Sequence, residues 1–135
     1  MQYRYLFKAK RKDNGEWVFG GLSYCEKTNA YFITNMGKDH ISYIGFHQEV
    51  DSNTICQCTG LKDKNGKLIW ENDIMVAHLD EDYPEDETYI RILWCGNGFC
   101  SIENGSKDIA PIDKFDSEHF EVCGNIFDNA ELLEE

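Results

Sequence analysis

The chain has 135 residues, of which 41% are apolar and 28% are charged, and its formal net charge is −12. This composition is typical of one globular domain that is long enough to bury a core without disulfides or metals. The longest apolar runs are only a few residues, which excludes a membrane-spanning helix, and the negative charge opposes binding to nucleic-acid phosphates.

Short strands are predicted throughout the first part of the chain. Alternating residues predict a strand over residues 3–8 and another over 17–22, where Gly20-Gly21 indicates a bulge or sharp bend. Aromatic and β-branched residues predict strands over 30–34 and 41–46, because such side chains suit a pleated surface.

The remainder of the chain continues the same pattern. Further strands are predicted over residues 54–59, 67–70, 74–78, 89–95, 99–102 and 120–126. The acidic stretch 80–87 predicts an exposed loop between two of them. Helical signals are limited to one turn over residues 111–115, with Pro111 at its first position, and one terminal turn that Asp128 or Asn129 would cap.

Four Asn-Gly pairs separate these strands, namely Asn14-Gly15, Asn65-Gly66, Asn97-Gly98 and Asn104-Gly105. Each pair fits a two-residue type I′ turn, because both positions of that turn need positive φ. The first three pairs lie between apolar-rich segments and predict hairpins, whereas polar residues follow the fourth. We therefore expect a mainly β protein built from antiparallel hairpins.

The predicted strands suggest an N-terminal meander and a small C-terminal barrel, for which an SH3-like topology would fit. We expect a single domain over residues 1–135, with a seam near residues 51–53. Charge differs between the halves: residues 1–68 carry a net +3 and residues 69–135 a net −15.

Two segments carry a family resemblance. The run Thr59-Gly60-Leu61-Lys62-Asp63-Lys64-Asn65-Gly66 continues to Ile74, and the tail contains Glu121-Val122-Cys123-Gly124-Asn125. Together they resemble the YopX family of prophage-encoded proteins. The resemblance is strongest over residues 54–76 and 119–133. It implies a phage or prophage accessory protein, and it carries no catalytic residue over to this chain. Because no apolar stretch follows the first residues, we expect the protein to stay in the cytoplasm of the bacterial host.

The chain departs from the family pattern at Asn72, where members commonly have glycine. Asparagine is one of the few other residues that tolerate positive φ, so we expect the turn to be kept. A second departure is Ala130, where members often have proline, which leaves the terminal turn less rigid.

The family motif admits two interpretations. In the functional interpretation, Asp63 and Asp73 form a shared acidic site. In the structural interpretation, Asp63 stabilises the Asn65-Gly66 hairpin and Asp73 accepts backbone N–H bonds after Trp70. We favour the structural interpretation. The residues with an expected structural role are Gly60, Asp63, Asn65, Gly66, Trp70, Asn72, Asp73, Gly124 and Asn125.

Candidate metal ligands are His47, Glu49 and Asp51, which would share one face of an extended segment. The alternative is an ordinary solvated face, which we prefer, and we expect neither a metal nor a cofactor. The six cysteines do not match zinc spacings. We therefore interpret the cysteines as thiols that pack in the core like small apolar side chains.

A basic cluster near the N-terminus could contact single-stranded nucleic acid beside aromatic side chains such as Tyr5 and Trp17. Its members are Arg4, Lys8, Lys10, Arg11 and Lys12. We prefer the alternative, in which alternate aromatics are buried and the cations face water.

No nucleophile, phosphate-binding or dinucleotide motif is present in the sequence. We therefore expect a non-enzymatic module that binds a host or phage protein or forms a homo-oligomer. The other hypothesis is a role with nucleic acid, either by single-strand binding through the N-terminus or by acidic mimicry of DNA. A metal-dependent enzyme is the third.

Overall fold

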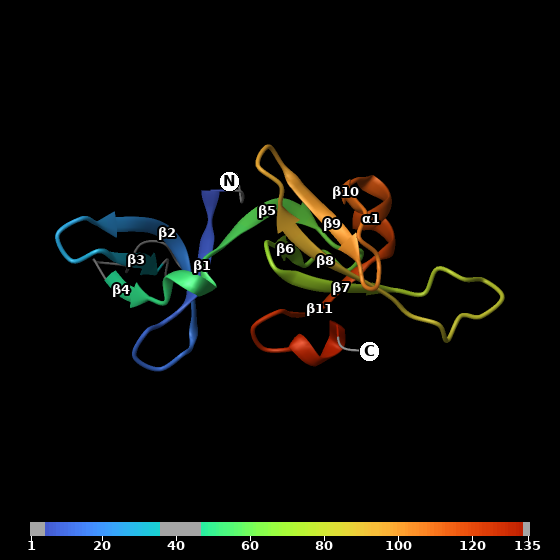
Figure 1. Ribbon diagram of the computed structural model, residues 1–135, viewed down its shortest axis with the longest axis horizontal. Helices are drawn as coiled ribbons and strands as arrows, with labels where there is room; N and C mark the ends of the chain where they lie inside the picture. The colour runs from blue at the N-terminus through green and yellow to red at the C-terminus, as the bar shows by residue number, and fades with distance from the viewer. Residues whose placement is uncertain (1–4, 36–46, 134–135) are drawn as a thin grey trace. The chain divides into compact units, whose positions relative to one another are not determined.

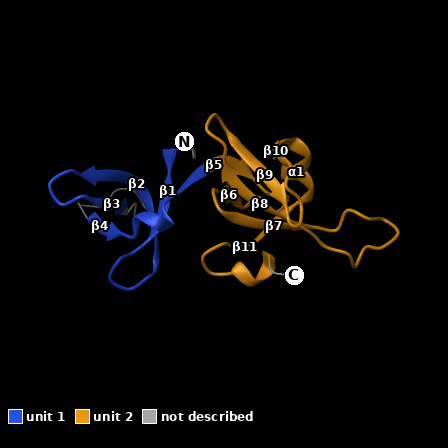
Figure 2. Ribbon diagram, in the orientation of Figure 1, with its two compact units in different colours: residues 1–58 blue, residues 59–135 orange. Residues whose placement is uncertain are grey.

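The structure is a computed structural model and describes residues 5–35 and 47–133. In these ranges strands form two antiparallel sheets and the helical segments are short (Figure 1). The predicted mainly β, antiparallel fold is confirmed. Contacts divide the chain into a first unit, residues 1–58, and a second unit, residues 59–135 (Figure 2). The strand predicted over residues 41–46 lies outside the described residues.

The first unit is an antiparallel meander. Its strands are β1 (Phe7–Lys10), β2 (Trp17–Cys25), β3 (Ala30–Asn35), β4 (His47–Val50) and the beginning of β5 (Cys56–Lys62). They are ordered β4-β3-β2-β1-β5. A bridge between Arg11 and Val50 links the end of β1 to β4, and a 3₁₀ turn, η2 (Ser52–Thr54), leads into β5.

The core of the first unit consists of Ala9, Val18, Ile33 and Val50. Ala9 is paired with Val18 across β1 and β2, so their side chains point to the same face of the sheet. The bulge predicted at Gly20-Gly21 is not found, because the strand register is continuous through both residues, and Gly20 has another role. A Cβ at this position would lie 1.9 Å from the carbonyl oxygen of Thr34, so only glycine allows β2 and β3 to approach this closely.

The second unit contains a hairpin and a five-stranded sheet. The hairpin joins the later part of β5 to β6 (Leu68–Trp70). The sheet has the order β10-β9-β8-β7-β11. Its strands are β7 (Asp73–Ala77), β8 (Thr88–Trp94), β9 (Phe99–Glu103), β10 (Ile109–Pro111) and β11 (Glu121–Asn125). A helix, α1 (Lys114–His119), precedes β11, and a 3₁₀ turn, η3 (Ala130–Leu133), follows it.

The core of the second unit lies on one face of this sheet. Met75, Ala77, Ile90 and Ile92 project from β7 and β8 and are at most 5% exposed. Other chain segments cover them, with buried side chains contributed by Ile69 on β6 and by Phe120 after α1. The β5–β6 hairpin therefore joins the core through side chains.

The small closed barrel predicted for this half is not found in the described residues. The edge strands β10 and β11 do not pair, and the β5–β6 hairpin belongs to the other sheet. The reason is that β6 has only three residues and forms no strand pairing with the five-stranded sheet. Its residue Ile69 joins the core through side-chain packing alone.

The Asn-Gly pairs lie in turns, but the predicted two-residue type I′ geometry is wrong. In all four pairs the asparagine lacks positive φ. Between β5 and β6, Gly66 has φ +82°, its N–H donates to Asp63 O (3.0 Å), and Asp63 N–H donates to Lys67 O (2.8 Å). This is a type I turn followed by a left-handed glycine. In the β8–β9 hairpin the left-handed residue is Gly96, not Asn97.

The helical turn predicted at Pro111 is displaced along the chain. Pro111 ends β10, and α1 begins at Lys114 after the cap residue Asp113. Asp113 and Asp116 form a reciprocal capping box, which fixes where the helix begins. The terminal turn is η3, as predicted. In the part of the chain that the structure describes, no helix is long and apolar enough to cross a membrane.

Candidate functional site

Asp63 holds the family motif together through its carboxylate. It is 6% exposed, and its Oδ1 accepts the N–H groups of Asn65 and Lys67 at 2.9 Å each. Its Oδ2 accepts the N–H of Val122 on β11, also at 2.9 Å. One carboxylate therefore shapes the hairpin and ties it to a strand 59 residues away in the chain.

Asp73 performs a similar task in the turn between β6 and β7. It is 2% exposed, and its Oδ2 accepts the N–H of Trp70 at 2.8 Å. Asn72 has φ +71°, the backbone region in which asparagine can replace glycine. Its N–H donates to Ile92 O (2.7 Å) and its carbonyl accepts the N–H of Ile126 (3.1 Å). The turn that leads into β7 is thus hydrogen-bonded both to β8 and to the tail after β11.

The tail motif closes on itself around Gly124. A Cβ on Gly124 would lie 2.5 Å from Oδ1 of Asn129, so any other residue here would have to displace the Asn129 side chain. The same Oδ1 accepts the N–H of Asn125 at 3.2 Å, and Oδ1 of Asn125 accepts the N–H groups of Phe127 and Asp128 at 2.9 Å. Gly60, the remaining motif residue, lies in β5 with φ +83°. The carboxylates of Asp63 and Asp73 and the amide oxygen of Asn125 thus accept backbone N–H groups.

The candidate metal ligands on and after β4 point to different partners. Nδ1 of His47 lies 3.3 Å from Oγ1 of Thr34, and Glu49 pairs with Lys12 at 3.1 Å. Asp51 caps η2 by accepting the N–H of Asn53. No group of three His, Cys, Asp or Glu side chains in the described ranges could hold a metal ion together.

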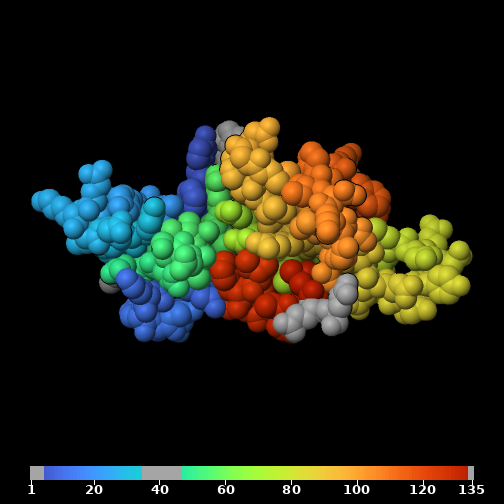
Figure 3. All heavy atoms as spheres, viewed as in Figure 1, coloured from blue at the N-terminus to red at the C-terminus, as the bar shows by residue number. Residues whose placement is uncertain are grey.

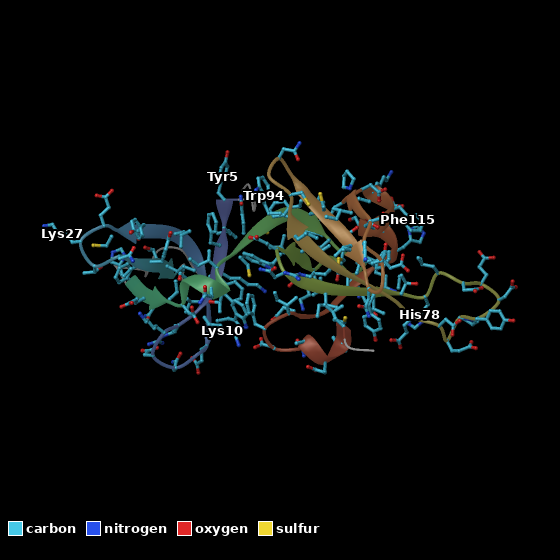
Figure 4. The ribbon with its side chains drawn as sticks, in the orientation of Figure 1. Tyr5, Lys10, Lys27, His78, Trp94 and Phe115 are labelled. Atoms are coloured by element: carbon cyan, nitrogen blue, oxygen red, sulfur yellow. The ribbon has the colours of Figure 1, made fainter. Side chains whose placement is uncertain are left out.

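The basic cluster is engaged with neighbouring side chains. Lys8 is 8% exposed, and its Nζ lies 4.7 Å from the centre of the Trp17 ring. Nζ of Lys10, which is labelled in Figure 4, lies 5.5 Å from the centre of the same ring. Arg11 bonds Asp13 through two nitrogens, at 3.0 and 2.7 Å. Lys12 pairs with Glu49, as described above. Arg4 lies outside the described residues.

The expected separation of buried aromatics from exposed cations is wrong for β1 and β2. Trp17 pairs with Lys10 and Phe19 with Lys8 across the two strands, so all four side chains share one face. Phe19 is 44% exposed. The small residues Ala9 and Val18 occupy the core face instead.

The cysteines are all free thiols. Cys56 and Cys58 are at most 1% exposed in β5. A hydrogen bond with Cys95 raises the pKa of Cys100, and burial raises the pKa of Cys123. The pKa of Cys25 is lowered by hydrogen bonds with Thr28, not by a histidine. None of these three pKa shifts thus arises from a histidine, the base that commonly activates a nucleophilic thiol.

A groove lies beside α1 in the second unit, and we call it the α1 groove. It has a volume of about 350 Å³. Its apolar lining comes from the sheet, from α1 and from the residues that follow β7. These residues are Leu79, Ile90, Ala110, Phe115 and Phe120. Ile90 and Phe120 are buried, whereas Leu79 and Phe115 are 40% and 48% exposed.

Polar side chains surround this apolar lining. The groove is lined by the carboxylates Glu103, Asp108 and Asp116, and by the hydroxyl residues Thr88, Ser101 and Ser106. Burial raises the pKa of Asp116 above its ordinary value, because desolvation disfavours the charged form. The described lining contains no lysine or arginine. The groove therefore combines apolar surface with negative charge.

The sequence did not predict this groove. Residues 103–114 are mainly polar, and α1, at six residues, is too short to show a 3.6-residue apolar stripe. The one available signal was Phe115, a large apolar residue between charged neighbours.

Comparison with known proteins places the chain in a family. The family model described as "YopX protein" matches residues 6–134. Among solved structures, the crystal structure of protein EF1440 from Enterococcus faecalis is similar, with a TM-score of 0.58 and 25% sequence identity. The similarity covers 95% of this chain and 96% of that one. A search of curated proteins gave no match.

Proposed function

The chain belongs to the YopX protein family, and on that basis we propose that it is a non-enzymatic interaction module of a phage or prophage. In this proposal it acts on a host or phage protein and carries out no chemistry of its own. The observation that carries the proposal is the α1 groove, a hollow in the second unit that combines an apolar lining with three carboxylates. Exposed apolar surface of this kind is typical of binding sites.

The buried carboxylates support the same proposal. Asp63 and Asp73 accept backbone N–H bonds that hold turns and strands together. Each carboxylate therefore has a structural task, which supports a folded interaction module rather than catalysis by these two residues.

Affinity capture tests this proposal. The purified protein, immobilised through a terminal tag, is exposed to bacterial lysate, and sedimentation equilibrium measures its own association. We expect one protein at a stoichiometric level or a concentration-dependent oligomer. Recovery of chaperones alone, together with a monomer at every concentration, would contradict the proposal.

A second candidate is mimicry of DNA by the acidic half. The loop between β7 and β8 is exposed over residues 78–87 and carries six carboxylates (Figure 3). Mimicry predicts competition with DNA for a DNA-binding protein and no mobility shift of oligonucleotides. Direct binding to single strands would give a salt-sensitive shift, but the engagement of Lys8, Lys10 and Arg11 with Trp17 and Asp13 weighs against it.

A further inference from the structure

We propose that the α1 groove binds a short, extended, basic peptide segment of a partner protein, and that one apolar side chain of this segment inserts between Leu79 and Phe115. This inference rests on the proposed function and adds the location of the site and the chemistry of the partner. Three features of the groove support it, namely its apolar surface, the sign of its charge and the character of the neighbouring sheet edge.

The apolar surface provides a place for one anchor side chain. Ile90 and Phe120 lie at the buried end of the groove, while Leu79 and Phe115 leave large apolar areas exposed. The ring of Phe115 is held by stacking on His119, with 4.1 Å between ring centres. A volume of about 350 Å³ is at the small end for a binding site, which suits a single side chain better than the face of a helix.

The charge of the groove selects a cationic segment. Glu103 on β9, Asp108 before β10 and Asp116 on α1 approach the groove from three elements. The nearby cation Lys114 is paired with Glu118 at 3.6 Å on the helix surface. Lysine or arginine residues on both sides of the anchor would therefore meet carboxylates, whereas an acidic segment would be repelled.

The burial of Asp116 also favours a cationic ligand. Its partial burial disfavours the ionised form and raises its pKa. A bound cation would stabilise the carboxylate and bring that pKa back down. The free groove thus carries an electrostatic cost that a basic ligand relieves.

The edge of the sheet argues for recognition by side chains rather than by strand addition. Ile112 N–H donates to Phe99 O, so the backbone groups of Ile109 and Pro111 point away from β9. Pro111 has no N–H, and proline on an edge strand is a common means of preventing strand addition. β10 is therefore a poor template for a further strand.

Three labelled peptides test the proposal by fluorescence polarisation with the full-length protein. The probe is acetyl-KRLKR-amide, the anchor control is acetyl-KRGKR-amide, and the charge control is acetyl-EELEE-amide. We expect the probe to bind, the anchor control to bind roughly tenfold more weakly, and the charge control not to bind. Equal binding of probe and anchor control would overturn the proposal, as would the absence of binding at millimolar peptide.

Matched variants separate the groove from general electrostatic attraction. Glu103→Gln with Asp108→Asn removes two charges from the groove, and Glu81→Gln with Glu85→Gln removes two from the exposed loop. We expect roughly five- to tenfold weaker binding for the first pair and less than a twofold change for the second. Equal effects would show that the groove is not the site. Circular dichroism confirms that each variant is folded.

Ala110→Trp fills the groove from the exposed strand β10 without removing a charge. We expect it to abolish probe binding while the urea unfolding curve stays unchanged. The same variant distinguishes this inference from the proposed function. If it still captures the partner found with the unaltered protein, the groove assignment fails and the interaction module survives. If neither protein captures a partner or self-associates, the proposed function itself fails.

Discussion

Replacing Asp63 tests whether the family motif is a structural device. The Asp63→Ala variant would deprive three backbone N–H groups of their acceptor, each now bonded at 2.9 Å. The Asp63→Asn variant keeps one acceptor oxygen, which can still serve the hairpin, but its amide group cannot accept the N–H of Val122. The two variants therefore remove different parts of the same network.

The magnitude follows from where each donor lies. A hydrogen bond to a charged acceptor contributes about 1.5–3 kcal/mol, and a buried donor left unpaired costs about 1–3 kcal/mol. Water can replace the acceptor for Asn65 and Lys67, which are in an exposed loop, but less easily for Val122 on β11. We expect a loss of about 3 kcal/mol in the free energy of unfolding for Asp63→Ala and about 1.5 kcal/mol for Asp63→Asn.

Urea unfolding followed by tryptophan fluorescence measures both losses, with Asp108→Asn as the exposed control. Amide hydrogen exchange adds a local measurement, since the Val122 amide should lose protection in both variants. If Asp63→Ala changes the free energy of unfolding by less than about 0.5 kcal/mol, the value typical of surface substitutions, the structural interpretation of the motif is wrong.

Three further predictions concern single positions. Asn72→Ala should lower the free energy of unfolding by about 1–2 kcal/mol, because alanine is strained at φ +71°. Asn72→Gly should lower it by less, and equal urea midpoints for the two variants would contradict this prediction. Gly124→Ala should cost about 1–3 kcal/mol through its clash with Asn129, and adding Asn129→Gly should recover part of that loss in a double-mutant cycle. With its pKa lowered, Cys25 holds more thiolate at neutral pH than Cys100, whose pKa is raised, so iodoacetamide should label Cys25 first and at lower pH. Mass spectrometry of the native protein checks this, and equal labelling rates would refute it.

Much of the fold follows from short-range signals in the sequence. The hairpins at Asn14-Gly15, Asn65-Gly66 and Asn97-Gly98 were predictable, because a glycine between apolar-rich segments favours a reversal wherever it occurs. The type of turn was not predictable, because an Asn-Gly pair fits both a two-residue and a three-residue loop. The pairing of the flanking strands selects between them.

The motif residues divide in the same way. That Asp63 and Asp73 shape local turns can be read from sequence, since aspartate commonly bonds backbone groups two to four residues away. That Asp63 also binds Val122 cannot, because nothing local brings residues 63 and 122 together. Trp17 shows a similar limit. Period-two alternation places its side chain on the other face of the sheet from Ala9 and Val18, but it does not say which face becomes the core.

The sequence by itself therefore determined the β class, the family and most of the reversals, all of which depend on neighbouring residues. Only the tertiary structure decided that Leu79, Glu103 and Phe115 line one hollow with Ala110 and Phe120. These residues come from separate elements, and the sheet order and the capping box of α1 bring them together. A site assembled by packing leaves no periodic pattern in the chain, because each contributing element supplies only one or two of its side chains.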